Sequence, residues 1–296
     1  MRALAILGPH AKEKDLAPFR ALGAEIAAVE NLRQASTQQP ADAVLVLGGD
    51  GTVQRHLADL VRARLPLLVV PAGSANDFAR ALGLRMWADS LHAWRRFLAD
   101  GENIRQIDVG ILNFAGEDAR STTPPTYFSC AAGAGVDAEV ARQANSLPGW
   151  ARAHGGYFLA AIPALLRFRA QPMTVMATKG DGKPLRVISE AGILAVAANT
   201  PWYGHGMRVA PQAALDDGQI EVCFVRRIGK LRLLRLFPKV YRGSHIGVPE
   251  VEYFRAARLR IESQSPLDVH ADGELVGRTP VEVSVAPRAL RVIAEC

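Results

Sequence analysis

The chain has 296 residues, 49% of them hydrophobic, and a formal net charge of +6. This length allows one large or two ordinary domains, and the hydrophobic content suffices for buried cores, which excludes an intrinsically disordered chain. The positive charge favours anionic partners such as nucleotides or acidic lipid headgroups. Nucleic acid is not expected as a partner, because the basic residues are spread along the chain without a recognisable nucleic-acid module.

Cysteine usage and hydropathy indicate a reducing compartment. The three cysteines, Cys130, Cys223 and Cys296, are far apart and form no C-x-x-C pair, which argues against a disulfide framework or a zinc site. The most apolar stretch, 157–166, is about half of the ~20 residues that cross a bilayer, and it contains Pro163. We therefore expect a cytoplasmic protein that contacts membranes only peripherally.

The first third of the chain alternates short apolar runs with helix-like segments. Apolar runs occupy residues 3–7, 25–30, 43–49 and 65–73, and helix-like segments occupy 11–23, 53–64, 76–84 and 87–99. This alternation predicts an α/β domain with a parallel sheet. Ligands of such sheets bind outside the carboxyl ends of the strands.

Two of these strand ends carry glycine together with polar residues. "GGDGT" at 48–52 ends one apolar run, and "PAGSAND" at 71–77 ends the next. Glycine lets a ligand approach the backbone, and a following helix directs its positive end at an anion. Asp50 would need a bridging Mg²⁺ or water to meet a phosphate. One such turn could equally be a helix cap, but two neighbouring turns favour a phosphate and metal site.

The second half has a different pattern. A polar, proline-rich segment from about 113 to 127 predicts a loop or linker. Beyond it, short apolar runs bounded by Gly, Pro and Asp predict an antiparallel β domain, with helices near 150–168 and 229–242. "GAGVDA" at 133–138 matches a dinucleotide-binding pattern, but no βαβ unit surrounds it. Rossmann-type NAD binding is therefore not expected.

Taken together, these motifs resemble the diacylglycerol kinase catalytic-domain family, specifically the soluble bacterial lipid kinases, which are related to sphingosine and ceramide kinases and remotely to NAD kinases and phosphofructokinases. Besides the two glycine turns, the matching segments are "IDVG" (107–110), "YFSCAAGAGVDAEV" (127–140), "PQAALDDGQIEV" (211–222) and "HADGE" (270–274). The resemblance covers nearly the whole chain. It implies a nucleotide-binding α/β domain over 1–112 with a parallel sheet of the NAD kinase and phosphofructokinase type. It also implies an antiparallel β-sandwich domain over 113–285, with a tail at about 286–296 able to return to the first domain.

The resemblance also implies an activity, which is phosphorylation of a hydroxyl of diacylglycerol or a similar membrane lipid by ATP with Mg²⁺, in the cleft between the two domains. Phosphoryl transfer needs a positioned alcohol, a metal ion that neutralises charge and a carboxylate that takes the hydroxyl proton. By resemblance, ATP phosphates bind Gly48, Gly49, Asp50, Gly51, Thr52, Ser74 and Asn76, with Asp77 beside them. Asp217 binds a structural Mg²⁺ with the backbone carbonyls of Ala214 and Gln219. Glu274 is the general base, with Asp50 and Asp77 as the other catalytic carboxylates.

Some residues depart from the family pattern. The first strand runs into "LGPHAKEK" (7–14) in place of an Asn-Pro and Ser-Gly pattern, where Lys12 or Lys14 could supply a positive charge, and Gln54 and Arg55 replace an Asn-Glu pair. Two alternatives therefore stay open. One is a catalytically weakened nucleotide- or lipid-binding protein of the same fold, and the other is a kinase of a soluble alcohol.

Three further features bear on partners. Segment 229–243 places Arg232, Arg235, Lys239 and Arg242 on one helical face, which suits either docking on anionic lipid or packing on a domain. The apolar residues Trp150, Tyr157, Phe158, Leu165, Leu166 and Phe168 suit an acyl-chain pocket or an ordinary core. His270 is close to Glu274 in sequence, but lone histidines are more often structural than catalytic. The sequence does not determine whether the chain forms a homodimer.

Overall fold

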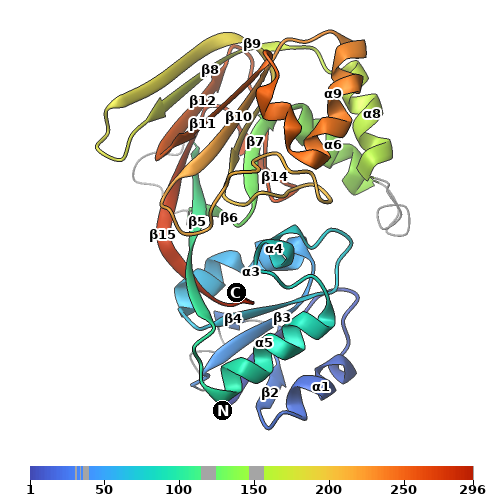
Figure 1. Ribbon diagram of the computed structural model, residues 1–296, viewed down its shortest axis with the longest axis vertical. Helices are drawn as coiled ribbons and strands as arrows, with labels where there is room; N and C mark the ends of the chain where they lie inside the picture. The colour runs from blue at the N-terminus through green and yellow to red at the C-terminus, as the bar shows by residue number, and fades with distance from the viewer. Residues whose placement is uncertain (31, 34, 36–39, 115–124, 147–156, 296) are drawn as a thin grey trace. The chain divides into compact units, whose positions relative to one another are not determined.

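The computed structural model describes residues 1–30, 32–33, 35, 40–114, 125–146 and 157–295 (Figure 1). The chain forms two compact units. The N-terminal unit comprises Met1–Asp108 and Pro287–Cys296, and the C-terminal unit comprises Val109–Ala286. Most of the predicted linker at 113–127, and the start of the predicted helix at 150–168, lie outside the described residues.

A parallel sheet forms the centre of the N-terminal unit. Its strands are β1 (Arg2–Leu7), β2 (Glu25–Ala28), β3 (Ala43–Gly48) and β4 (Leu67–Pro71), in the spatial order β4-β3-β1-β2. The end of β15 (Val281–Ile293) continues the sheet beside β4, with Val292 opposite Leu67. Every residue of β3 and β4 is buried, as expected for apolar strands covered on both faces. The predicted parallel sheet is confirmed.

The helices of this unit follow the strands. They are the 3₁₀ helix η1 (Glu13–Leu16), α1 (Ala17–Arg20), α3 (Asp50–Ala63), α4 (Asp77–Ala81) and α5 (Trp87–Ala99). The single helix expected over 11–23 is instead two short pieces, because Pro18 suits only the first turn of a helix. Helix α5 packs on β4, where the buried Ser90 hydroxyl donates a hydrogen bond to the carbonyl of Val69 at 2.9 Å.

The C-terminal unit is built from antiparallel strands. They are the second part of β5 (Ile104–Phe114), from Val109 on, and β6 (Thr126–Phe128), β7 (Ala131–Gly135), β8 (Gln171–Thr178), β9 (Pro184–Ala198), β10 (Ile220–Arg226), β11 (Val251–Ala256), β12 (Arg258–Ser263), β13 (Asp268–Ala271) and β14 (Glu274–Arg278), with the first part of β15. The main path runs β14-β13-β7-β9-β8-β12-β15. Strand β9 pairs with β8 along its first part, and with β7 and β10 along its second. The predicted antiparallel β domain is confirmed.

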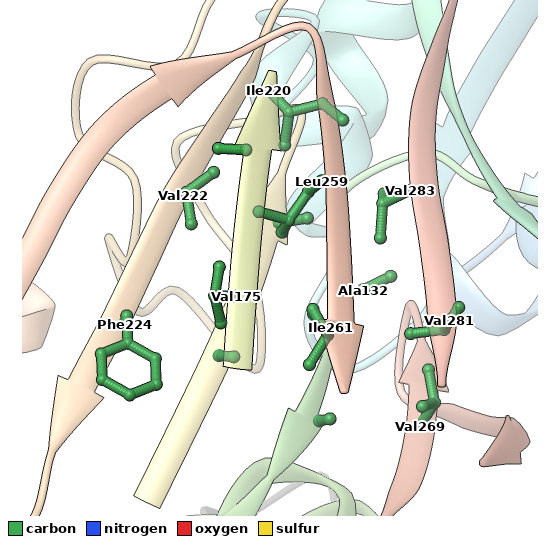
Figure 2. Close-up of a cluster of buried hydrophobic side chains, with 14 of the residues drawn as sticks. Ala132, Val175, Ile220, Val222, Phe224, Leu259, Ile261, Val269, Val281 and Val283 are labelled. Carbon is green, nitrogen blue, oxygen red and sulfur yellow. The ribbon is translucent and has the colours of Figure 1, made fainter. Parts of the chain in front are cut away.

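The core of this unit lies between the strands. Figure 2 shows that its buried side chains come from β7, β8, β10, β12, β13 and β15, and they include Ala132, Val175, Ile220, Val222, Phe224, Leu259, Ile261, Val269, Val281 and Val283. Most are β-branched or aromatic, and these residue types pack well on a pleated sheet. This core fixes the positions of strands β10 and β13, next to which the loop before β10 and the turn between β13 and β14 lie.

Three helices belong to the C-terminal unit in the described part of the chain: α6 (Val136–Ser146), α8 (Tyr157–Arg167) and α9 (Lys230–Arg242), with the 3₁₀ helix η3 (Ser244–Gly247) after α9. Buried residues of α6 and α8 pack together, and Leu233 and Phe237 of α9 lie against them. Across the described ranges of both units, no helix is long and apolar enough to cross a membrane.

Candidate active site

The loops that follow β3 and β4 meet in the N-terminal unit. The N–H of Ala72 donates to the carbonyl of Gly48 at 3.0 Å. A Cβ atom added to Gly49 would lie 2.8 Å from the Cα of Gly73, and one added to Gly73 would lie 2.4 Å from the Cα of Gly49. Real Cβ atoms essentially never approach backbone so closely. Glycine is therefore required at both positions for the two loops to touch.

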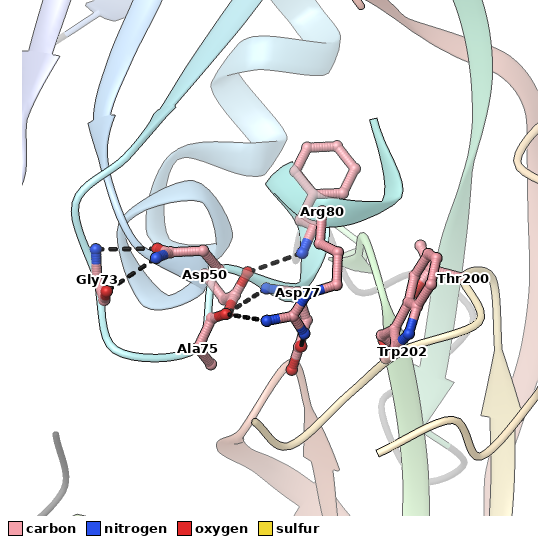
Figure 3. Close-up of polar contacts among 9 residues, drawn as sticks. Asp50, Gly73, Ala75, Asp77, Arg80, Thr200 and Trp202 are labelled. Carbon is pink, nitrogen blue, oxygen red and sulfur yellow. Dashed lines mark hydrogen bonds and ion pairs between the residues drawn. The ribbon is translucent and has the colours of Figure 1, made fainter. Parts of the chain in front are cut away.

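Asp50 joins the two loops (Figure 3). Its carboxylate accepts hydrogen bonds from the backbone N–H groups of Asp77 at 3.1 Å and Phe78 at 2.9 Å. These groups belong to the first turn of α4, whose N-cap residue, Asn76, makes no capping bond with its own side chain. Since the first N–H groups of a helix lack partners within the helix, the Asp50 side chain supplies from α3 the capping bonds that Asn76 does not make.

The side chains of Asn76 and Asp77 shape the second loop. Asn76 is left-handed (φ 53°), a conformation that asparagine tolerates, and its amide accepts from the N–H of Gly73 at 2.9 Å and donates to the carbonyl of Gly73 at 2.8 Å. Asp77 is buried and forms an ion pair with Arg80 at 2.6 Å. Arg80 also donates to the carbonyl of Ala75 at 3.3 Å. Asp50, Asn76 and Asp77 thus all hold the loops in place.

The other predicted nucleotide-binding residues differ in exposure. Thr52 is buried, and a Cβ atom added to Gly48 would lie 2.5 Å from the Thr52 hydroxyl oxygen. Gly51 and Ser74 are exposed, and Gly49 and Gly73 are partly exposed. The most exposed parts of the site are therefore the backbone of Gly51 and the residue Ser74, with Asp50 and Asn76 partly exposed beside them, at the N-terminus of the 14-residue helix α3. Such a surface suits an anion. Lys12, at the start of η1, and Lys14, within it, are exposed.

In the C-terminal unit, Asp272 fixes the turn between β13 and β14. It is left-handed (φ 49°), and its carboxylate accepts four hydrogen bonds: from the N–H and hydroxyl of Ser129 at 2.7 and 2.8 Å, and from the N–H groups of Cys130 at 2.8 Å and Ala131 at 3.0 Å. Burial raises the pKa of the Asp272 carboxyl, although these hydrogen bonds act in the opposite direction. Each oxygen of this carboxylate accepts two hydrogen bonds, and together they hold the turn against residues 129–131.

Glu274 follows this turn as the first residue of β14, opposite Ala271 of β13. It is exposed, and within the described residues no ion pair involves its carboxylate. The family motif predicted a role for Glu274 but none for Asp272, because an Asp-Gly pair is typical of an ordinary hairpin turn. The carboxylates of Asp272 and Glu274, two residues apart, therefore have different environments. That of Asp272 accepts four hydrogen bonds, whereas that of Glu274 is exposed.

Another carboxylate, the buried Asp137, lies at the start of α6 and pairs with His270 of β13. Both side chains are almost fully buried, and the other oxygen of Asp137 accepts from the N–H of Ala138 at 2.9 Å. The Tyr203 ring stacks on the His270 ring with centroids 6.3 Å apart. Burial alone would lower the pKa of His270, but the adjacent Asp137 raises it above its ordinary value. Sequence analysis also missed this pair, whose members are 133 positions apart.

The predicted structural metal site lies in the loop before β10. Asp217 accepts a hydrogen bond from the N–H of Gln219 at 3.0 Å, and Arg255 approaches its carboxylate to 3.9 Å. Over the residues described, no three His, Cys, Asp or Glu side chains are grouped to hold a metal ion. A cation here would therefore need backbone carbonyls, such as those of Ala214 and Gln219. Carboxylate and carbonyl oxygens are the ligands that Mg²⁺ and Ca²⁺ accept.

Comparisons with known proteins define the class and then the family. Residues 7–112 match the diacylglycerol kinase catalytic domain, and residues 130–294 match the YegS C-terminal NAD kinase beta sandwich-like domain. The chain is 30% identical over 272 residues to the diacylglycerol kinase of Mycobacterium tuberculosis, covering 92% of this chain and 83% of that protein. It is 27% identical to the diacylglycerol kinase of Bacillus subtilis, covering 85% and 77%. The chain is thus a phosphotransferase of the lipid kinase class. It belongs to the diacylglycerol kinase family, as the motifs predicted.

Solved structures show the same fold. A diacylglycerol kinase from Bacillus anthracis has a TM-score of 0.67 at 18% identity, covering 99% of this chain and 97% of that one. An NAD kinase from Archaeoglobus fulgidus, solved in complex with ATP, has a TM-score of 0.52 at 12% identity, covering 99% and 93%. The predicted relation to the NAD kinase fold is confirmed.

The contact between the two glycine loops gives a first prediction. Gly73→Ala places a methyl group against the backbone of Gly49, and such overpacking is expected to lower the free energy of unfolding by about 1–3 kcal/mol. Urea denaturation measures the change. Gly180→Ala is the matched control, because nothing lies within 4 Å of its added Cβ. Equal stability of the two variants would contradict the close contact.

The Asp137–His270 pair predicts how stability changes with pH. Because the pKa of His270 is raised on folding, its contribution is complete below its unfolded pKa of about 6.5 and is lost as pH rises through the folded pKa. The free energy of unfolding should therefore fall as the pH rises above about 6.5. Asp137→Asn should abolish this fall, whereas a substitution of the exposed His92 should leave it intact. An unchanged pH profile in Asp137→Asn would refute the assignment.

Proposed function

We propose that this chain transfers the γ-phosphate of ATP, with Mg²⁺, to a hydroxyl of diacylglycerol or a similar membrane lipid. The observation that carries the proposal is the junction of the two glycine loops through Asp50, which presents accessible backbone at the N-terminus of α3. Relatives named diacylglycerol kinase support the choice of acceptor, and an NAD kinase of the same fold solved with ATP supports the choice of donor.

The phosphates of ATP would lie against the loop backbone. Gly49, Gly51 and Gly73 leave that backbone uncovered, and Ser74 adds an exposed hydroxyl. Gly48 and Thr52 contribute from beneath by fixing the shape of the first loop. This arrangement resembles other phosphate sites in which N–H groups at a helix N-terminus bind the anion.

Mg²⁺, when bound, would neutralise charge on the phosphates. Asp50 and Asp77 are the carboxylates of the N-terminal unit that would hold it, either directly or through water. Asp50 is partly exposed and is fixed by its bonds to α4, so it would hold the ion directly or through water. Asp77 is buried and paired with Arg80, so it would act through a water molecule. A second Mg²⁺ at Asp217, Ala214 and Gln219 would stabilise the loop before β10.

Glu274 is the proposed general base. A base must have a lone pair free to accept the proton of the acceptor hydroxyl. The carboxylate of Asp272 takes four hydrogen bonds, whereas Glu274 is exposed and has no ion pair within the described residues. Asp272 therefore positions the turn, and Glu274, two residues later, is left to act on the acceptor.

Transfer of labelled phosphate from ATP to diacylglycerol in mixed micelles tests this function. Glu274→Gln should lower kcat by about 10²–10⁴-fold, the usual contribution of a general base, with little change in KM for ATP. Glu282→Gln, an exposed carboxylate of the same unit, is the matched control.

Full activity in Glu274→Gln would remove Glu274 as the base. Wild-type protein that binds ATP with Mg²⁺ but labels no acceptor would favour the weakened binding protein. Labelling of soluble alcohols alone would show that the chain is a kinase of a soluble alcohol.

Helix α9 would provide peripheral contact with an anionic membrane in the cytoplasm. Arg232 is paired with Glu250 at 2.6 Å, but Arg235, Lys239 and Arg242 are exposed, and no ion pair involves them in the described chain. Leu231 is 74% exposed beside them. Basic residues with exposed apolar neighbours are typical of helices that lie on acidic lipid. Cys130 and Cys223 are buried and form no disulfide within the described residues, which is consistent with a reducing compartment.

Membrane contact predicts a charge-dependent affinity for vesicles. Each basic residue near an anionic surface contributes about 1 kcal/mol, so Arg235→Glu with Lys239→Glu should weaken binding to phosphatidylglycerol vesicles by at least ~30-fold at low salt. Vesicle sedimentation measures this affinity. Lys179→Glu with Lys183→Glu changes the net charge equally, on the turn between β8 and β9, and should have a much smaller effect. Equal losses in both pairs would show a general charge effect without docking through α9.

A further inference from the structure

We infer that the buried pair of Asp137 and His270 positions the proposed base, Glu274, for its reaction with the acceptor hydroxyl. The inference rests on the proposed function, because it concerns the carboxylate that would take the proton of the acceptor. Neither member of the pair touches the substrate in this account. Both act through the hairpin of β13 and β14, and they are therefore positioning residues.

The strand that carries Glu274 has few contacts of its own. Strand β14 lies at the end of the strand order, and among the described strands it pairs with β13 alone. None of its residues is buried. A segment with so little buried surface opens easily unless its neighbour holds it. The position of Glu274 thus depends on how firmly β13 is held.

The pairing of β13 with β14 is interrupted at His270. Val269 lies opposite Gly277, whereas His270 lies opposite Leu275, so that β14 has one extra residue at this point. Such a β-bulge disrupts the ladder locally and bends the strand. The part of β14 that begins at Glu274 lies between this bulge and the turn. The pair thus holds β13 at the residue where its regular backbone pairing with β14 is broken.

The pair joins β13 to the junction of β7 and α6. Strand β7 pairs with β13, with Gly133 opposite His270, and α6 begins directly after β7. Gly135 has a φ of 123°, and a Cβ atom there would lie 2.4 Å from the carbonyl oxygen of Ile193, so glycine is required where the chain turns into α6. Helix α6 packs on both strands of the hairpin (Figure 1). The bond between Asp137 and His270 therefore ties this helix to the hairpin.

The His270 ring has no other polar contact that could replace Asp137. Its Nε2 hydrogen-bonds to the Asp137 carboxylate, and within the described residues its Nδ1 has no hydrogen-bond partner. The Tyr203 ring stacks on it with an angle of 17° between the planes, which fixes the plane of the imidazole but not its rotation within that plane. Removal of the carboxylate would leave a buried imidazole without a hydrogen bond, which is costly.

The charges around the pair favour one arrangement. Burial lowers the pKa of His270, but the carboxylates of Asp137 and Asp272 raise it by more, which favours an imidazolium opposite Asp137. The other titratable groups beside the pair are Tyr203 and Cys223, and burial with the nearby Asp137 raises the pKa of Cys223 to about 12, so that this thiol stays neutral. A buried charged pair seldom adds net stability over apolar residues of similar size. Its presence beside the hairpin is better explained by positioning.

Kinetics test the inference against a variant that loses a different ion pair. Asp137→Ala should lower kcat by about 10–100-fold, because a misplaced group acts less efficiently, with little change in KM for ATP. Asp137→Asn should recover most of kcat, because an amide oxygen still accepts the hydrogen bond of the imidazole. Glu252→Ala is the matched control. It removes the partner of Arg186 and Arg226 on β11, which does not pair with the hairpin, and should leave kcat unchanged.

Amide hydrogen exchange tests the positioning without any need for activity. Exchange within residues 268–278 should be at least ~10-fold faster in Asp137→Ala than in wild type, with Asp137→Asn close to wild type. Residues 258–263, which form β12 in the core of the same unit, should exchange at the wild-type rate in every variant, as expected if the unit stays folded. Glu252→Ala should leave the exchange of the hairpin unchanged.

The outcomes separate this inference from the proposed function. Faster exchange of the hairpin together with a lower kcat in Asp137→Ala, both restored in Asp137→Asn, supports the inference. Faster exchange with an unchanged kcat overturns it, because the pair would then serve stability alone. Unchanged exchange, or an equal loss of kcat in Glu252→Ala, also overturns it while leaving the kinase intact. A wild type that transfers no phosphate overturns the proposed function and the role of Glu274, although faster exchange would still show that the pair holds the hairpin.

Discussion

The N-terminal site depends on the carboxylate of Asp50. It binds two N–H groups of α4, which begins 27 residues later, and so joins the loops after β3 and β4. The contact between Gly49 and Gly73 is possible because neither residue has a side chain, and Asp50 maintains that contact. Without this carboxylate, the first turn of α4 would lose the partner of two N–H groups. A phosphate site made of backbone N–H groups requires a backbone whose conformation is fixed before the ligand binds. The Asp50 side chain contributes to fixing it through its two bonds to α4.

The C-terminal unit uses carboxylates in the same way, to build a turn before any chemistry occurs. Asp272 binds three consecutive residues at the start of β7, and Asp137 joins α6 to His270 of β13. The bond of Asp137 is buried and those of Asp272 are partly buried, and in such surroundings an unpaired carboxylate would be costly. The exposed Glu274 is thus carried on a hairpin that is held at both its turn and its first strand. In both units, then, most of the acidic residues near the proposed chemistry have structural partners, and few are free to meet substrate.

The sequence predicted the features that depend on local pattern. The alternation of apolar runs identified both kinds of sheet, and α9 at Lys230–Arg242 matches the helix expected at 229–242. It could not predict which polar side chains meet across long separations. The bond from Asp50 to Phe78 and the pair of Asp137 with His270 form only after strands are placed side by side. Asp272 was overlooked because an Asp-Gly pair is typical of any hairpin turn, and its four partners come from residues 129–131. The incomplete burial of α9 is likewise a property of tertiary packing, which helical periodicity does not report.

The division of the chain has a consequence for biosynthesis. The segment Pro287–Cys296 belongs to the N-terminal unit, where Leu290, Val292, Ile293 and Ala294 are buried and Val292 pairs beside Leu67. Domains generally fold in order as the ribosome releases them. Here the N-terminal unit cannot complete its hydrophobic core until residues 287–295, which follow the whole C-terminal unit, have been translated. The nascent chain must therefore keep the open edge of β4 from pairing wrongly while the second domain is being made.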